Sequence, residues 1–151
     1  MLRTILLAAT LALPVATLST PAAAATVPEA LAMASAARQQ AGLPPLRSNA
    51  RLARAAEAQA RHMRSQQKMG HVGPGGNSLS DRARAAGYRM CYGAENVADG
   101  WPSVNAVHRA WMNSPSHQKN IMNPNVTEGA VAAVQDGNGR LWWVMVLGSR
   151  C

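Results

Sequence analysis

The sequence contains no phenylalanine, and its aromatic residues are limited to four tryptophans and two tyrosines. A hydrophobic core must therefore be built around those few rings, with alanines and eight methionines filling the remaining space. Methionine suits this role because its flexible thioether packs into irregular gaps. Acidic residues are also scarce, at seven against fifteen lysines and arginines, which gives a net charge of +8.

Long apolar runs are missing from the chain except at its start. Met1–Arg3 is short and positive, Thr4–Leu18 is mostly apolar, and Pro21–Ala25 supplies small residues for cleavage. This order is typical of a secretory signal peptide, and the apolar run is too short for a transmembrane helix. We predict a signal peptide over residues 1–25 and one domain over residues 26–151. The mature protein is expected to be periplasmic or extracellular, monomeric and without a transmembrane anchor.

The basic excess predicts which partners the exported chain would meet. Most basic residues lie between Arg38 and Arg89. Such a surface is attracted to anionic envelope polymers or lipid headgroups. Nucleic acid would be the usual partner inside a cell, but export argues against it. A simpler interpretation is a solvated helical face that keeps the protein soluble.

The chain has two cysteines, Cys91 and Cys151. An even number in an exported protein favours one disulfide. That bond would close a loop of about 60 residues and stabilise the fold by about 4 kcal/mol on the chain-entropy model. The alternative is a pair of free or intermolecular thiols.

The first half of the mature chain predicts three helices separated by loops. The first spans Pro28–Ala41, and a second begins after Ser48, which we expect to be its N-cap. Four glycines and a proline within Gly70–Asn77 indicate a loop without regular structure. A capping box at Ser78–Asp81 then indicates a third helix, expected over Asp81–Ala86.

The second half predicts two more helices and a hairpin. A long helix is expected to begin at Pro102 and a short one at Pro115, with Ser114 as N-cap. Strands at Glu128–Gln135 and Arg140–Leu147 flank a turn sequence. Both faces of the second strand are apolar, so we expect helices to cover both sides. The fold class is therefore α+β, a three-layer α-β-α sandwich around a small antiparallel sheet.

Two histidines and one glutamate stand out as candidate site residues. His71 lies in the glycine-rich loop, Glu95 precedes Asn96, and His117 begins the short helix. Two imidazoles and a carboxylate could hold zinc with a water ligand. Alternatively Glu95 could orient an imidazole N–H, or Glu95 and Asn96 could pin a loop by accepting backbone N–H groups.

Several short motifs occur here in a characteristic order and spacing. They are His71, Ala94–Val97, Trp111–Met112 and Ser114–Ile121. Together they resemble the CAP superfamily of cysteine-rich secretory, antigen 5 and pathogenesis-related 1 proteins, and most closely its secreted bacterial branch. The resemblance covers roughly residues 30 to 151. It implies a cleft lined by two histidines and two acidic residues.

The resemblance assigns the histidine roles to His71 and His117 and one acidic role to Glu95. Ser114 stands where the second acid of the family is expected, which weakens metal binding. The resulting cleft would contain His71, Glu95, Asn96, Ser114 and His117. For some members the resemblance implies sterol or lipid binding.

Three functions follow as hypotheses. The first is a non-catalytic cleft that needs no cofactor and binds an envelope component, a lipid or a small hydrophobic ligand. The second is a zinc-dependent hydrolase acting on peptides, with His71 and His117 holding the metal and Glu95 activating water. The third is a basic protein that adheres to anionic polymer. The missing second acid and the lack of an oxyanion-hole motif favour binding over catalysis.

Overall fold

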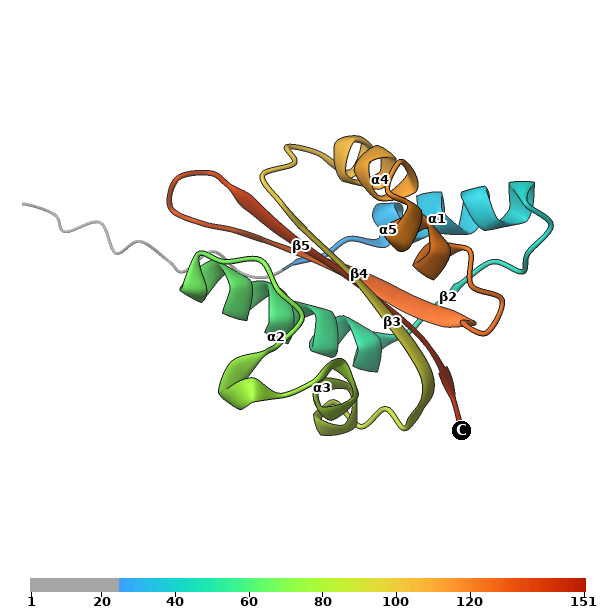
Figure 1. Ribbon diagram of the computed structural model, residues 1–151, viewed down its shortest axis with the longest axis horizontal. Coiled ribbons are helices and arrows are strands. Elements are labelled where there is room, and N and C mark those ends of the chain that lie inside the picture. The colour runs from blue at the N-terminus through green and yellow to red at the C-terminus, as the bar shows by residue number, and fades with distance from the viewer. Residues whose placement is uncertain (1–24) are drawn as a thin grey trace, which may run out of the picture.

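Residues 25–151 are described by a computed structural model of the protein (Figure 1). The predicted signal peptide lies almost entirely outside these residues. Five helices and five strands are joined in the following order: β1 (Ala25–Thr26), α1 (Pro28–Gln40), β2 (Arg47–Ser48), α2 (Ala50–Gln66), a 3₁₀ turn (Pro74–Gly76), α3 (Leu79–Ala85), β3 (Met90–Asp99), α4 (Val104–Met112), α5 (Pro115–Ile121), β4 (Glu128–Gln135) and β5 (Leu141–Arg150). No helix in the described part of the chain is long and apolar enough to cross a membrane.

One sheet forms the middle layer, in the order β1-β4-β5-β3. The β4–β5 hairpin is antiparallel and is closed by a turn at Asp136, whose N–H donates to the carbonyl of Arg140 at 2.9 Å. β3 pairs antiparallel with β5, while β2 adds a short parallel contact to β4. β3 is therefore an end strand of the sheet.

Helices cover both faces of the sheet, with α2 and α3 on one side and α1, α4 and α5 on the other (Figure 1). Alternate residues of β5 enter different clusters of the core. Trp143, Met145 and Leu147 pack with the α1, α4 and α5 layer, whereas Trp142 and Val144 pack with α2 and α3. The predicted three-layer sandwich is thus confirmed.

Two predicted helix starts are wrong. Asn49, not Ser48, caps α2, because its Oδ1 accepts from the N–H groups of Arg51 and Leu52. Ser48 belongs to β2, because its two neighbours pair with β4. The N–H of Arg47 donates to the carbonyl of Thr127, just before β4, and the N–H of Asn49 donates to the carbonyl of Gly129. α4 begins at Val104 rather than Pro102, with the Ser103 hydroxyl accepting from Ala106.

Three smaller local predictions had mixed outcomes. The capping box at Ser78 and Asp81 is confirmed, although α3 begins earlier than expected, at Leu79. The glycine-rich loop contains one 3₁₀ turn, at Pro74–Gly76. Ser114 does occupy the N-cap position of α5, but its side chain makes no capping hydrogen bond.

A buried arginine joins the first helix to the chain between α5 and β4. The Arg38 guanidinium is almost fully buried and donates to four carbonyls, those of Pro44, Ile121, Asn123 and Val126, at 2.7 to 3.1 Å. Charged donors make stronger hydrogen bonds than neutral ones. This clamp fixes the C-terminal end of α5 against α1.

The predicted disulfide between Cys91 and Cys151 is present, with the two Cα atoms 4.8 Å apart. It ties the end of β5 to the beginning of β3. The strand that carries Glu95 is consequently held at its start by the disulfide and along its length by pairing with β5.

Trp111 provides a test of the core. Its side chain is 1% exposed and packs in the α1, α4 and α5 cluster. We expect Trp111→Ala to lower the free energy of unfolding by about 3–5 kcal/mol in a urea titration. Trp101→Ala is the matched control, because Trp101 is 42% exposed and should cost about 0.5 kcal/mol or less. Equal losses in the two variants would contradict this core assignment.

Candidate functional site

Glu95 lies in the middle of β3 and is the buried acid of the candidate site. Its Oε2 accepts from Arg82 Nη2 of α3 at 2.5 Å, and its Oε1 accepts from His71 Nδ1 at 2.9 Å. The side chains of Arg82 and Glu95 are 1% and 3% exposed, whereas that of His71 is 60% exposed. One carboxylate therefore joins a helix, a strand and an exposed loop histidine.

Two buried side chains donate hydrogen bonds to the main chain of the loop that carries His71. Gln59 of α2 donates to the carbonyls of Gly70 and Val72, at 2.6 and 3.3 Å. Arg82 donates to the carbonyl of His71 at 3.1 Å. These contacts explain why the loop adopts one path although its sequence excludes a helix or strand.

Gly73 lies close to the two side chains that hold the loop. A Cβ at this position would lie 2.8 Å from Gln59 Oε1 and 2.9 Å from Arg82 Nη1. Such approaches are too close for a Cβ, so any other residue here would force the hydrogen-bonded side chains of Gln59 and Arg82 to shift. The glycine-rich composition thus serves a close approach as well as a turn.

Asn96 positions the second histidine from the opposite face of β3. Its Nδ2 donates to the main-chain carbonyl of His117 at 3.0 Å, and its Oδ1 accepts from Asn120 at 2.8 Å. Asn120 also donates to the carbonyl of Glu95 at 3.3 Å. The first and last turns of α5 are therefore bonded to the strand that holds Glu95.

The pKa values of the two imidazoles are shifted in opposite directions. The hydrogen bond to Glu95 raises the pKa of His71 above its ordinary value of 6.5. Burial, followed by the charge of His71, lowers the pKa of His117 below the same value. A pH range therefore exists in which His71 is charged and His117 is neutral.

An apolar cavity of about 220 Å³ opens beside His117, between the end of β3 and the helices α4 and α5. It is lined by nine residues: Met69, Val97, Ala98, Asp99, Trp101, Ala110, Trp111, Ser114 and His117. Met69 also borders a neighbouring hollow of about 330 Å³ that contains His62 and His71. His117 and His71 therefore lie in two adjoining cavities, and Met69 borders both of them.

The five predicted cleft residues take three different positions. His71 and Glu95 are hydrogen-bonded to each other, and Ser114 and His117 line the apolar cavity. Asn96 is buried and acts through its bonds to α5 rather than by facing the cavity. The Ser114 hydroxyl lies 3.3 Å from that of Ser116.

Sequence reasoning missed Arg82, Gln59 and Asn120, and it did not place Met69 or Trp101 at the cleft. Arg82 follows a recognisable capping box, but nothing local separates it from Arg84, its exposed neighbour on the same helix. Arg82 and Ala83 are buried whereas Arg84 and Ala85 are exposed, a difference that depends on how α3 packs against β3.

The zinc hypothesis finds an incomplete ligand set. In residues 25–151 no three His, Cys, Asp or Glu side chains are grouped so that they could hold a metal ion. Both oxygens of Glu95 are engaged by Arg82 and His71. Three protein ligands are usual for catalytic zinc, so these residues do not fit such a site, and we derive no catalytic step from it. Zinc binding by His71 and His117 alone stays a prediction.

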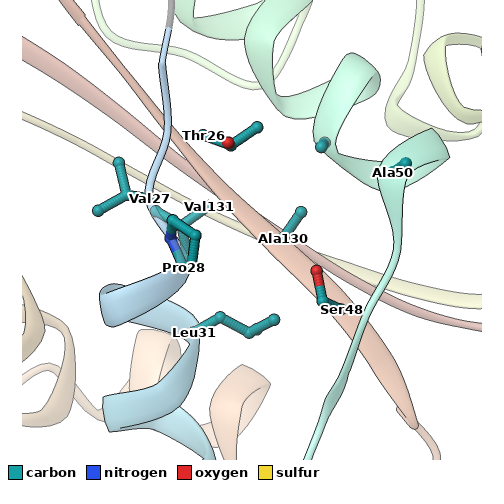
Figure 2. Close-up of a pocket in the computed structure, with 9 residues that line it drawn as sticks. Thr26, Val27, Pro28, Leu31, Ser48, Ala50, Ala130 and Val131 are labelled. Carbon is teal, nitrogen blue, oxygen red and sulfur yellow. The ribbon is translucent and has the colours of Figure 1, made fainter.

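A separate cavity of about 190 Å³ lies at the opposite edge of the sheet, between the starts of α1 and α2. Figure 2 shows its wall, with Leu31 and Val27 on the α1 side, Ser48 and Ala50 on the α2 side, and Ala130 on β4. None of the residues that line this cavity carries a titratable side chain. It offers apolar contact and hydroxyl groups but no acid, base or metal ligand.

The fold and this site define a class of protein. A profile of the cysteine-rich secretory protein family, CAP, matches residues 31–147. The chain belongs to that family. The resemblance read from the motifs around His71, Glu95 and His117 is therefore confirmed at the level of the family.

A bacterial relative agrees with this assignment. Uncharacterized protein YkwD of Bacillus subtilis strain 168 is 34% identical over 116 residues, which cover 77% of this chain and 44% of YkwD. This chain thus spans less than half the length of that relative.

Two solved structures share the fold at low sequence identity. An outer surface protein from Borrelia burgdorferi aligns with a TM-score of 0.74 and 21% identity, over 80% of this chain and 90% of that one. An extracellular protein containing an SCP domain from Bacillus anthracis aligns with a TM-score of 0.73 and 20% identity, over 82% of this chain and 40% of that one.

The coupling of the two histidines predicts a distinctive titration. We expect His71 to titrate above 6.5 and His117 below it when the ring protons are followed by NMR. His71→Gln removes one cause of the lowered value, so the pKa of His117 should rise. His108→Gln is the matched control and should leave His117 unchanged. An unaltered His117 in the His71→Gln variant would show that the two rings do not interact.

The same shift predicts how stability depends on pH. Because the pKa of His71 is raised on folding, its bond to Glu95 contributes fully below the unfolded value near 6.5. That contribution is lost as the pH rises through the folded value. His71→Gln should therefore narrow the difference in unfolding free energy between pH 6 and pH 9, and an unchanged difference would contradict the assignment.

Proposed function

We propose that this protein is an exported, non-catalytic binding protein. Its cleft receives the apolar part of an envelope component, a lipid or a small hydrophobic molecule. The observation that carries this proposal is the apolar cavity beside His117, bordered by two large hydrophobic side chains left in solvent. Met69 is 48% exposed and Trp101 is 42% exposed.

Hydrophobic burial supplies the driving force for such binding. Covering exposed apolar surface contributes roughly 25 cal/mol per Å². Ligand sites combine an apolar wall with a few polar groups that fix orientation. Here Met69 and Trp101 would provide the apolar wall, while Ser114 and His117 would provide the polar end.

The engagement of Glu95 favours binding over catalysis. A general base must reach a substrate or a water molecule with a free oxygen. Glu95 is buried, with one oxygen on Arg82 and the other on His71. Its contacts support a structural role, in which it orients the His71 loop.

Export and surface charge support an envelope setting. The predicted signal peptide directs the chain out of the cytoplasm, and one structure with the same fold is described as an outer surface protein. Arg51, Arg54 and Arg61 are exposed on α2. We infer that this face strengthens association with anionic polymer or headgroups, while the cleft supplies selectivity.

Binding of a neutral fluorescent probe tests the cleft. N-phenyl-1-naphthylamine carries no charge at neutral pH, so the basic surface does not attract it. We expect its fluorescence to rise on binding, and we expect Trp101→Ala to weaken its affinity at least tenfold because one apolar wall is removed. The readout is a fluorescence titration of the purified mature protein.

Tyr92→Ala is the matched control for this experiment. Tyr92 is also an aromatic residue, is 41% exposed and is not among the residues that line the cavity. The control should bind the probe like the unmodified protein. Equal losses in the two variants, or no binding to the unmodified protein, would refute the proposed function.

A further inference from the structure

β3 presents one free backbone edge toward the cleft. Among residues 25–151 its sheet neighbour is β5 alone, so the other edge pairs with no strand. The N–H of Gly100 donates to Leu141 on β5 at 2.9 Å. In an antiparallel ladder such bonded pairs recur at every second residue. Ala98 therefore bonds toward β5, whereas the N–H and C=O groups of Val97 and Asp99 point to the free edge.

One contact made by α5 supports this assignment of direction. Glu95 is two residues before Val97, so its carbonyl also points away from β5. This carbonyl accepts from the side-chain amide of Asn120 at 3.3 Å. The outer edge at Glu95 is thus occupied by α5. The next outward-facing groups along the strand are those of Val97 and Asp99.

The apolar cavity lies against the free edge of β3. Val97, Ala98 and Asp99 all line it. The side chains of Val97 and Ala98 enter opposite core clusters, with Val97 in the α2 and α3 layer and Ala98 in the α1, α4 and α5 layer. A cavity that touches both residues must therefore reach the main chain between them.

We propose that the cleft binds an extended peptide segment that adds as a strand to the free edge of β3. This inference rests on the proposed function, because it names the class of ligand for the same cleft. The backbone of the peptide would pair with the N–H and C=O groups of Val97 and Asp99. Its side chains would alternate between the Met69 side and the side formed by Trp101 and Trp111.

The hydrogen-bonding edge favours a peptide over an acyl chain. Unpaired backbone groups at a sheet edge are a template for another strand, whereas a hydrocarbon offers them neither donor nor acceptor. In β-strand addition, main-chain bonds supply affinity and side-chain pockets supply selectivity. The chain turns away at Gly100, which has a φ of 75°, so the available edge is short. A segment of three to five residues would fill it.

Amide hydrogen exchange tests this directly. The probe is a pool of capped octapeptides in which valine, leucine or tyrosine alternates with serine. With ¹⁵N-labelled mature protein, we expect the peptides to slow the exchange of the Val97 and Asp99 amides at least tenfold. The inward-facing amide of Ala98 should change much less. Protection confined to other elements, or none at millimolar peptide, would overturn the proposal.

Variants of the strand separate the backbone from the side chain. Asp99→Pro removes the outward N–H, and proline is tolerated on an edge strand where that group makes no ladder bond. Asp99→Ala keeps the N–H but also loses the ion pair with Arg140. We expect the peptides to bind the alanine variant at least fivefold more tightly than the proline variant. Equal affinities would contradict backbone pairing.

Methylated peptides provide a second measurement that needs no change in the protein. N-methylation of alternate residues in the phase facing β3 should weaken binding at least tenfold, and methylation in the other phase should have a smaller effect. Equal effects in both phases would overturn the inference. If N-phenyl-1-naphthylamine binds and the peptides do not, the inference fails and the proposed function stands. If neither binds, both fail.

Discussion

The buried ion pair between Arg82 and Glu95 is the interaction on which the site depends. A charge removed from water is tolerated only with a partner, and breaking such a pair from one side costs about 3–5 kcal/mol. The 2.5 Å contact therefore obliges α3 and β3 to pack together. The guanidinium of Arg82 also donates to the carbonyl of His71. The ion pair that joins α3 to β3 therefore positions the loop that carries His71 as well.

The other wall of the cleft, formed by α5, is attached to β3 by a different set of hydrogen bonds. Asn96 and Asn120 join β3 to α5, and Arg38 fixes the far end of α5 against α1. Both walls are thus anchored to consecutive residues, Glu95 and Asn96, whose side chains point to opposite faces of the sheet. The exposed side chains of Met69 and Trp101 border the apolar cavity that lies beside these residues.

Local patterns predicted the fold because they depend on near neighbours in the chain. The uninterrupted apolar run of β5 and the capping box at Ser78 could be recognised without any distant contact. The cap of α2 was misplaced because Ser48 and Asn49 are both good caps, and pairing with β4 decides between them. Family motifs located His71 and Glu95, but they could not reveal Arg82, which differs from Arg84 only in the direction its side chain takes.

Hydrogen exchange of the loop over residues 70–77 would test the role of the ion pair most directly. If Arg82 and Glu95 organise the site, Arg82→Met should speed exchange throughout this loop at least tenfold while leaving the β4–β5 hairpin protected. Adding Glu95→Gln should restore part of the lost stability, because it replaces the carboxylate left without its Arg82 partner by a neutral amide. A loop that exchanges at its original rate in Arg82→Met, or a double variant whose losses simply add, would contradict the account.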